Sequence, residues 1–328
     1  MNSTAAPAAR VVAEAALSAA QRVRSRLRRS NRRFVLTMLA PTAFFLLAFY
    51  VYPTVFNIEN SFTDLDLFGL RRGGNWIGVA NYLELATSPD FLRVLWNTAF
   101  WLTFVGVAVR IVLGLLLALL LNSHALVRWR LATAARVLLL VPWATPPIVA
   151  IIVWRWMLDT RVGIINQLLV ASGLSAHPIA FLATAGWIWP ALIVIITWNT
   201  LPLVTLTFLA ALQSIPTELV ETAEVAGASR WQIVRYVYLP LLRPAIVVMV
   251  MMSTFWTFNN FVYVWLTTGA GPGLYTNVMA TEVYIKAFID GRLGYSSAVG
   301  VVMATAMILF GILYLRIVTA RNLGESFG

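Results

Sequence analysis

Six long apolar stretches alternate with polar segments along the chain. They cover residues 34 to about 55, 95–121, 137–158, 179 to about 212, 245–268 and 296–318. Each is long enough for the ~20 residues that an α-helix needs to cross a bilayer. Pro142 and the pair Pro146-Pro147 are expected to break the third stretch within the membrane, and Pro190 and Pro202 to interrupt the fourth. The pattern predicts an all-α polytopic membrane protein with six transmembrane helices.

Short elements are expected in several of the polar segments. A short amphipathic helix is predicted around 164–170 and another helix within 274–292, whereas the glycine-rich segment 269–273 is expected to be a turn. These pieces connect the spans, and none of them is long enough to form a soluble domain.

The polar segment 213–243 predicts two short helices joined by a tight turn. Pro216 suits an opening turn, and Gly227 is a natural helix end. Ser229 then starts the second helix, with Gln232 three residues later in a capping-box pattern. The pattern leaves two interpretations open: an ordered loop between two spans, or a docking site for another protein.

Composition supports the membrane assignment. Of the 328 residues, 60% are hydrophobic and 11% are charged, with a mean hydropathy of +0.80, whereas a soluble domain is typically about 25% charged. The net charge of +11 could indicate a nucleic-acid partner, but the arginines cluster at the ends of apolar stretches, where membrane orientation explains them. We therefore expect no nucleic-acid binding.

Arginine-rich segments mark the cytoplasmic side of a membrane protein. Residues 1–33 and 122–136 are rich in arginine, and residues 57–91 are not. This places both termini and the segment 213–243 in the cytoplasm. Residues 1–33 are expected to be a basic arm, either an interfacial helix on anionic lipid or a disordered tail. Residues 34–320 would form the membrane domain, and 321–328 a cytoplasmic tail.

Residues with catalytic chemistry are scarce. The chain has no cysteine, and its two histidines, His124 and His177, fall in predicted loops. There is no phosphate-binding P-loop, and Lys286 is the only lysine. We expect no catalytic residue, no metal site and no bound cofactor. An ion-coupled secondary transporter is the alternative; it predicts internal repeats and an intramembrane carboxylate, but we find no repeats and the last three spans carry no central Asp or Glu.

The segment Glu221-Thr-Ala-Glu-Val-Ala-Gly227, then nine residues, then Val237-Tyr-Leu-Pro240, resembles the EAA loop of ABC importer permeases. The departures are Thr222 in place of an alanine and Val237 in place of an isoleucine. Flanking segments are also similar: IPTEL, WIGVANYLEL, WNTAFW, GLLLALLLN, FNNFVYVWLTTGAGPG and GYSSAVGVV. Over about residues 34–320 the chain resembles a binding-protein-dependent inner-membrane permease of the MalF/UgpA-like carbohydrate type, with a MetI-like transmembrane domain.

This resemblance implies a bacterial cytoplasmic (inner) membrane subunit of an ATP-driven importer for a sugar or sugar derivative. The implied partners are a homologous second permease (MalG/UgpE-like), a dimer of cytoplasmic ATP-binding subunits that holds ATP and Mg²⁺, an extracytoplasmic solute-binding protein and membrane lipid. In the family the EAA helix sits in a cleft of the ATPase. The residues implied in coupling are Glu221, Ala223, Glu224, Ala226, Gly227, Ala228, Leu239 and Pro240.

Polar and aromatic residues inside the spans are candidates for the substrate pathway. They are Arg110, Trp198, Asn199, Trp256, Asn259, Asn260 and Tyr263, the last four at helical spacing. Aromatic rings that stack on a sugar, and amides that bond its hydroxyls, suit a carbohydrate site. Helix packing is the alternative for the aromatic and amide residues; for Arg110 it is pairing with the partner permease or snorkelling. The sugar, and which permease holds it, stay open, although Arg110 favours an anionic solute.

Overall fold

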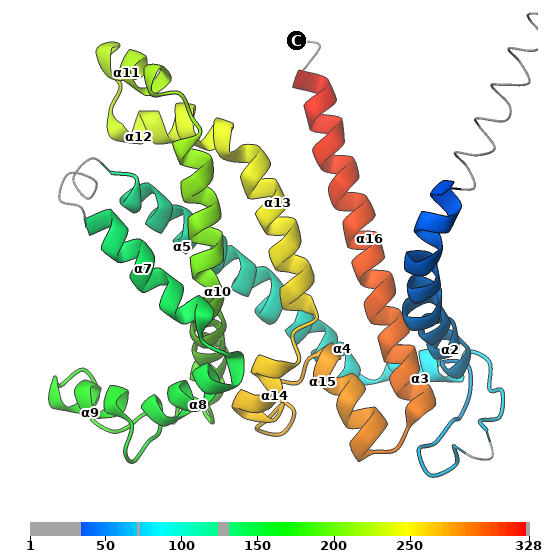
Figure 1. Cartoon of the computed structure of the whole chain (residues 1–328). Coiled ribbons are helices and arrows are strands. Elements are labelled where there is room, and N and C mark those ends of the chain that lie inside the picture. The colour runs from blue at the N-terminus through cyan, green and yellow to red at the C-terminus, as the bar shows by residue number, and fades with distance from the viewer. Residues whose placement is uncertain (1–33, 71–72, 124–130, 326–328) are drawn as a thin grey trace, which may run out of the picture. The chain divides into compact units, whose positions relative to one another are not determined.

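The computed structural model describes residues 34–70, 73–123 and 131–325. Within these ranges the chain is helical, with isolated bridging pairs and no strand. By length and composition, five helices can cross a membrane, and a bent pair of helices, taken as one span, brings the number to six (Figure 1). The predicted all-α, six-span architecture is therefore confirmed. The predicted arm over 1–33 lies outside the described residues.

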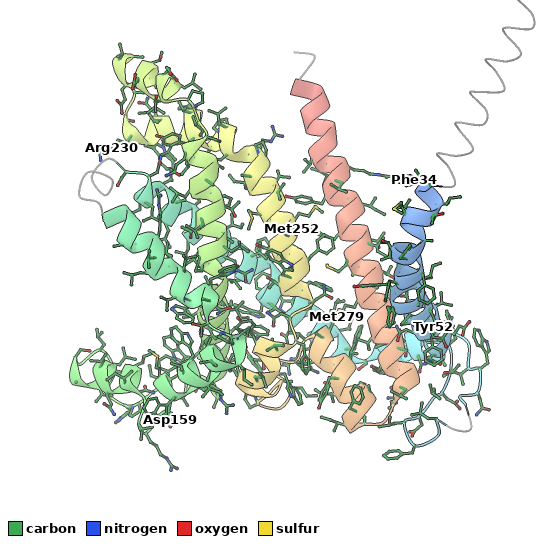
Figure 2. The ribbon with its side chains drawn as sticks, in the orientation of Figure 1. Phe34, Tyr52, Asp159, Arg230, Met252 and Met279 are labelled. Carbon is green, nitrogen blue, oxygen red and sulfur yellow. The ribbon has the colours of Figure 1, made fainter. Side chains whose placement is uncertain are left out.

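The first span is a unit of its own, which ends at Glu59. Its helix covers Phe34–Asn60 and includes a widened turn at Leu47–Val51 followed by α2 (Tyr52–Asn60). Figure 2 shows Phe34 and Tyr52 towards opposite ends of this helix. None of its most apolar window is buried. A helix that is apolar on all sides suits contact with lipid or with other membrane helices.

The second unit, which begins at Asn60, contains the other spans. They are α4 (Pro89–Trp96) continued by α5 (Gly106–Leu121), the bent pair α7 and α8, α10 (Ala185–Gln213), α13 (Leu239–Phe258) and α16 (Leu293–Glu325). In α10, 61% of the most apolar window is buried, against 17% for the span of α13 and for that of α16, so α10 is the central helix. Gly114 permits its close packing on α5, because an added Cβ would lie 2.7 Å from Val204 Cγ1.

The two proline-containing spans behave differently. The third is broken as predicted: α7 (Leu131–Ala144) and α8 (Pro147–Met157) meet at 97°, with Pro146 in extended backbone. Pro142, however, lies within α7. The predicted interruption of the fourth span is wrong, because α10 runs unbroken through Pro190 and Pro202. Burial of the central helix outweighs the lost backbone hydrogen bonds.

The fifth span is not the single helix over 245–268 that the pattern predicts. It ends at Phe258, and α14 (Val262–Thr268) begins after a break. Two asparagines make the break: Asn259 Nδ2 donates to Phe255 O at 2.8 Å, and Asn260 Oδ1 accepts from Tyr263 N at 3.1 Å. These short side chains compete for backbone groups and so terminate helices. Trp256, Asn259, Asn260 and Tyr263 therefore do not share one helix.

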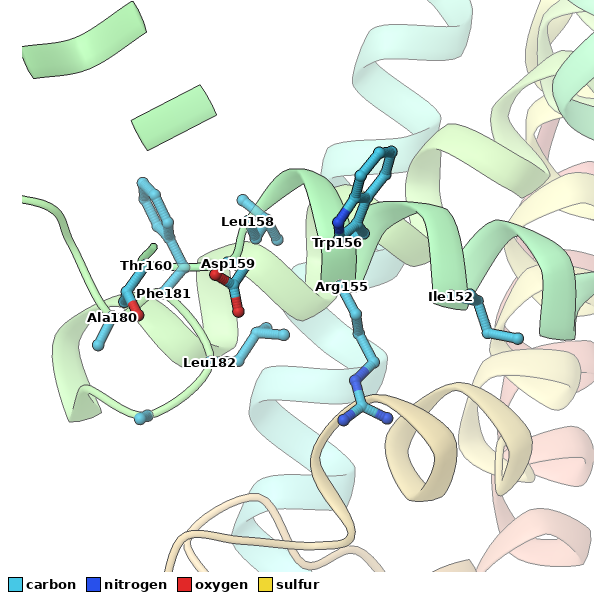
Figure 3. Close-up of a pocket in the computed structure, with 10 residues that line it drawn as sticks. Ile152, Arg155, Trp156, Leu158, Asp159, Thr160, Ala180, Phe181 and Leu182 are labelled. Carbon is cyan, nitrogen blue, oxygen red and sulfur yellow. The ribbon is translucent and has the colours of Figure 1, made fainter. Parts of the chain in front are cut away.

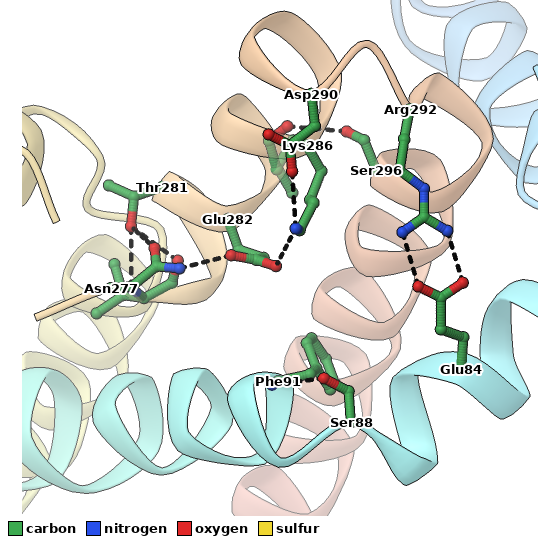
Figure 4. A network of polar contacts seen from close by, with 12 residues as sticks. Glu84, Ser88, Phe91, Asn277, Thr281, Glu282, Lys286, Asp290, Arg292 and Ser296 are labelled. Atoms are coloured by element: carbon green, nitrogen blue, oxygen red, sulfur yellow. Dashed lines mark hydrogen bonds and ion pairs between the residues drawn. The ribbon is translucent and has the colours of Figure 1, made fainter. Parts of the chain in front are cut away.

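Several short elements lie at the end of the bundle opposite α11 (Thr217–Val225) and α12 (Arg230–Ile233), as Figure 1 shows. These are α3 (Ala80–Thr87), α9 (Ile164–Ala171) and α15 (Met279–Tyr284), so the helices predicted around 164–170 and within 274–292 are confirmed. In Figure 4, Glu84 of α3 faces Arg292, the residue that precedes α16, with bonds of 2.7 and 2.5 Å. Lys286 lies between Glu282 (4.0 Å) and Asp290 (2.8 Å). Burial raises the pKa of Glu282.

Candidate functional site

A cavity of about 450 Å³ opens at the break between α7 and α8. Residues from α5, α7, α8, α10, α13 and the start of α14 line it. Five of the seven predicted pathway residues are among them: Arg110, Asn199, Trp256, Asn260 and Tyr263. These five residues are far apart in the sequence, between positions 110 and 263, and the fold brings them together around one cavity.

Asn199 holds the walls of this cavity together. Its Nδ2 donates to the carbonyls of Pro142 (2.7 Å) and Thr145 (3.0 Å), which lie at the end of α7 where the helix breaks. Its Oδ1 accepts a hydrogen bond from the Tyr263 hydroxyl. Backbone groups inside a membrane need partners. Both amide protons of Asn199 are therefore used within the fold.

Arg110 lies deep in the same wall, with 2% of its surface exposed. Its Nη1 donates to Thr257 Oγ1 at 3.0 Å, while Nε and Nη2 have no hydrogen-bond partner among the described residues. The predicted alternative of snorkelling does not describe this placement, because a snorkelling arginine keeps its head in water. In the described part of the chain, no acidic side chain forms an ion pair with it.

Two predicted residues do not line the cavity. Trp198 packs edge-on against Trp154, with ring centroids 6.0 Å apart. Asn259 caps the end of α13. Sequence reasoning also missed cavity residues, notably Trp143 and Ser253. Ser253 Oγ is buried and has no hydrogen-bond partner in the described part of the chain. Pro146-Pro147, close to Trp143 in the sequence, could have indicated that Trp143 lies at a break in the span. A lone serine in an apolar helix gives no such indication.

A second cavity, of about 530 Å³, lies between α8 and the segment 180–183 (Figure 3). Two of its polar side chains, those of Asp159 and Arg155, bond backbone groups of the fold. Asp159 Oδ1 accepts from the backbone N–H groups of Val162 (3.0 Å) and Arg161 (2.7 Å), which lowers the pKa of Asp159. Arg155 Nη1 donates to Leu266 O at 3.1 Å. None of the predicted site residues lines this second cavity.

The predicted helix-turn-helix is formed by α11 (Thr217–Val225) and α12 (Arg230–Ile233). Gly227 joins them at φ +82°. The N–H of Ala228 donates to Ala223 O at 2.9 Å, and the Ser229–Gln232 capping box is present. Unlike the prediction, the second helix is not separate from the span, because Arg230–Phe258 is one continuous helix.

The surface of α11 and α12 combines carboxylates with large apolar side chains. Glu221 and Glu224 are exposed, as are Ala226, Gly227 and Pro240, whereas Ala223, Ala228 and Leu239 are half-buried. Val225 is 90% exposed and Trp231 70% exposed, and sequence reasoning did not single out either residue. In Figure 1, α11 lies beyond the ends of α10 and α13. Large exposed apolar groups in such a position make α11 and α12 a candidate interaction surface.

Comparisons with known proteins agree with this architecture. The family described as "Binding-protein-dependent transport system inner membrane component" matches residues 110–322. A probable ABC transporter permease protein of Brucella suis biovar 1 is 34% identical, over 88% of this chain and 98% of that protein. The sulfoquinovosyl glycerol transport system permease protein SmoG of Agrobacterium fabrum is 33% identical, over 89% and 92%.

A similar fold occurs in the crystal structure of a bacterial ABC transporter involved in the import of the acidic polysaccharide alginate. The TM-score is 0.74 at 23% identity, over 89% of this chain and 98% of that one. The subunits of such importers are a permease, a binding protein and a separate ATPase. The chain belongs to the binding-protein-dependent transport system inner membrane components, and it is a multi-pass, non-catalytic permease subunit of an ABC importer.

Proposed function

We propose that this permease forms half of the translocation pathway for a sugar or sugar derivative, and that a homologous, MalG/UgpE-like permease supplies the other half. The observation that carries the proposal is the cavity at the α7–α8 break. Its volume of about 450 Å³ falls within the ~300–1,000 Å³ typical of small-molecule sites. The similarity to SmoG, the permease of a sulfoquinovosyl glycerol transport system, supports the same substrate class.

The cavity residues divide into contacts and supports. Trp143 and Trp256, both more than half exposed, offer ring faces to a sugar, and the Asn260 amide can bond hydroxyls. Asn199 is a positioning residue, since its amide protons are used by Pro142 and Thr145. Trp198 and Asn259 do not line the cavity and are not among the proposed solute contacts. The side chains proposed to contact the solute are thus different from the side chain that holds the cavity wall in place.

In this proposal, the ATP-driven movement of the ATPase is transmitted to the permease through α11 and α12. The carboxylate of Glu221 pairs with a cationic group of the ATPase, while Val225 and Trp231 fill an apolar cleft. Gly227 allows the turn that sets α11 against α12. The permease itself binds no cofactor, and ATP and Mg²⁺ are held by the ATPase dimer.

The helix Arg230–Phe258 connects this docking surface to the cavity. Its first turn is α12, and near its other end it carries Ser253 and Trp256 into the cavity wall. A displacement at α12 can therefore reach the cavity along one element. Figure 1 shows the C-terminal end of α16 at the same end of the bundle as α11. Together with the arginine distribution, this favours a cytoplasmic position for both.

Uptake by the complete transporter tests the proposed function. Permease pair, ATPase and binding protein are reconstituted in proteoliposomes, and entry of radiolabelled sugars is measured with and without ATP. Uptake should require ATP and the ATPase, and should survive collapse of the proton gradient. Uptake by this chain alone, driven by an ion gradient, would instead identify the ion-coupled secondary transporter.

A further inference from the structure

In the part of the chain that the structure describes, no acidic side chain pairs with the charge of Arg110. Arg110 is 2% exposed, and the six apolar stretches at 34–55, 95–121, 137–158, 179–212, 245–268 and 296–318 contain no Asp or Glu. Its single described bond goes to the neutral hydroxyl of Thr257, at 3.0 Å. A buried cation without an anion is costly in a membrane protein, and intramembrane charges normally mark solute pathways or pairs.

A second unpartnered donor lies on the same cavity wall. Ser253 is fully buried, and its Oγ has no hydrogen-bond partner within the ranges that the structure describes. Both Ser253 and Arg110 line the cavity. The two residues come from α13 and α5, so the fold brings together two groups that can donate hydrogen bonds. Guanidinium groups donate and never accept, and therefore the missing partner is an acceptor.

The cavity is the route by which an acceptor can approach Arg110, because Arg110 and Ser253 both line it. Nε and Nη2 of Arg110 each expose less than 1 Å², so an anion that bonds them has to displace the atoms that cover them. The charge acts strongly in the cavity because the local dielectric constant is low.

We propose that the solute carries an anionic group (a carboxylate, sulfonate or phosphate) on its sugar, and that Arg110 and Ser253 select for that group. The indole of Trp256 and the amide of Asn260 then face the neutral, hydroxyl-bearing part. Arg110 supplies the charge and Ser253 an additional hydrogen bond. This inference rests on the proposed function, and it narrows the substrate class from sugars in general to acidic sugar derivatives.

Charge-matched probes test the inference in the reconstituted transporter with its binding protein. The pairs are methyl β-glucoside with methyl β-glucuronide, and glycerol with glycerol 3-phosphate, each radiolabelled. We expect the anionic member of at least one pair to be taken up at least about tenfold faster, as a charge-assisted hydrogen bond would allow. Equal or faster uptake of the neutral members by the unmutated transporter would overturn the inference, and this measurement needs no variant.

Variants then assign the preference to residues. Arg110→Gln should lower uptake of the anionic probe about tenfold or more, Arg110→Lys should retain part of it, and Ser253→Ala should lower it a few-fold. Arg155→Gln is the matched control, because Arg155 does not line this cavity. If Arg110→Gln slows both members of a pair equally in an intact complex, Arg110 is structural and the inference fails.

The two proposals fail in different ways. Uptake of sugars without a charge preference leaves the proposed function standing and refutes the anionic solute. ATP-dependent uptake of no sugar probe, by a transporter that assembles and hydrolyses ATP, refutes both. Assembly is checked by co-elution of the permease with its ATPase in size-exclusion chromatography.

Discussion

The docking surface and the cavity differ in how far apart their interacting residues lie in the sequence. In the turn between α11 and α12, Ala228 bonds Ala223, and Gln232 bonds Ser229, all near neighbours. In the cavity wall, Asn199 bonds a carbonyl 57 positions away, and Arg110 bonds a hydroxyl 147 positions away. Local rules therefore govern the first region and the packing of several spans governs the second. Substitutions should reveal the same difference.

The largest effect is expected at the turn of the docking surface. Gly227→Leu places a branched side chain at φ +82°, which costs about 1–2 kcal/mol, and adds bulk beside the ATPase contact. ATPase binding and uptake should fall more than tenfold while the spans still insert, as measured by co-purification and transport. Gly173→Leu is the control, with a similar φ of +74° and open space around it. Normal docking of the Gly227 variant would contradict the assignment.

The next largest effect is expected at Asn199, in the cavity wall. Asn199→Leu removes the partners of two carbonyls and of the Tyr263 hydroxyl. Hydrogen bonds between membrane helices are worth about 0.6–1.7 kcal/mol each, and so the melting temperature of the detergent-purified protein should fall. Asn259→Leu, which removes one described bond within α13, should cost less. Equal losses would show that the long-range bonds do not hold the cavity.

Trp256 tests function rather than stability. Trp256→Ala should raise the KM for sugar uptake by about tenfold, since an aromatic contact removed from a binding site commonly costs 1–2 kcal/mol. ATPase co-purification should not change, because Trp256 lies far along the helix from α12. Trp198→Ala is the control outside the cavity. An unchanged KM for the Trp256 variant would remove this residue from the proposed solute contacts.

The smallest effect is expected at the exposed pair Glu84–Arg292, although its residues are 208 positions apart. Arg292 lowers the pKa of Glu84, mainly through its hydrogen bonds. The stabilisation is therefore present above the ordinary glutamate pKa and is lost as the pH falls through the lowered value. Glu84→Gln should cost at most about 1 kcal/mol at pH 7 and nothing in acid, as thermal unfolding at both pH values would show. A larger loss of stability would mean that the long sequence separation of the two residues matters more than their exposure to solvent.

Particular residues show where prediction from the sequence stopped. Ser229 and Gln232 predicted a capping box and Pro146-Pro147 a break, because each acts on adjacent backbone. The interruption of the fourth span predicted from Pro190 and Pro202 is wrong, since burial of α10 maintains the helix around them. The spacing of Asn259 and Asn260 with Trp256 and Tyr263 predicts one helical face, but the asparagine side chains bond backbone groups and end the helix. Ser253 gave no signal, because its importance comes from its neighbours.

The sequence by itself determined the number of spans, the turn at Gly227 and the family resemblance of the segment 221–240. Those properties depend on hydrophobic length, backbone conformation and residue order, which are local. Only the tertiary structure decided that Arg110, Ser253 and Trp256 face one cavity and that Asn199 supports it. An apolar helix has no polar face to fix its rotation in the membrane. Packing around α10, through contacts such as Gly114 with Val204, decides which side chains point inward.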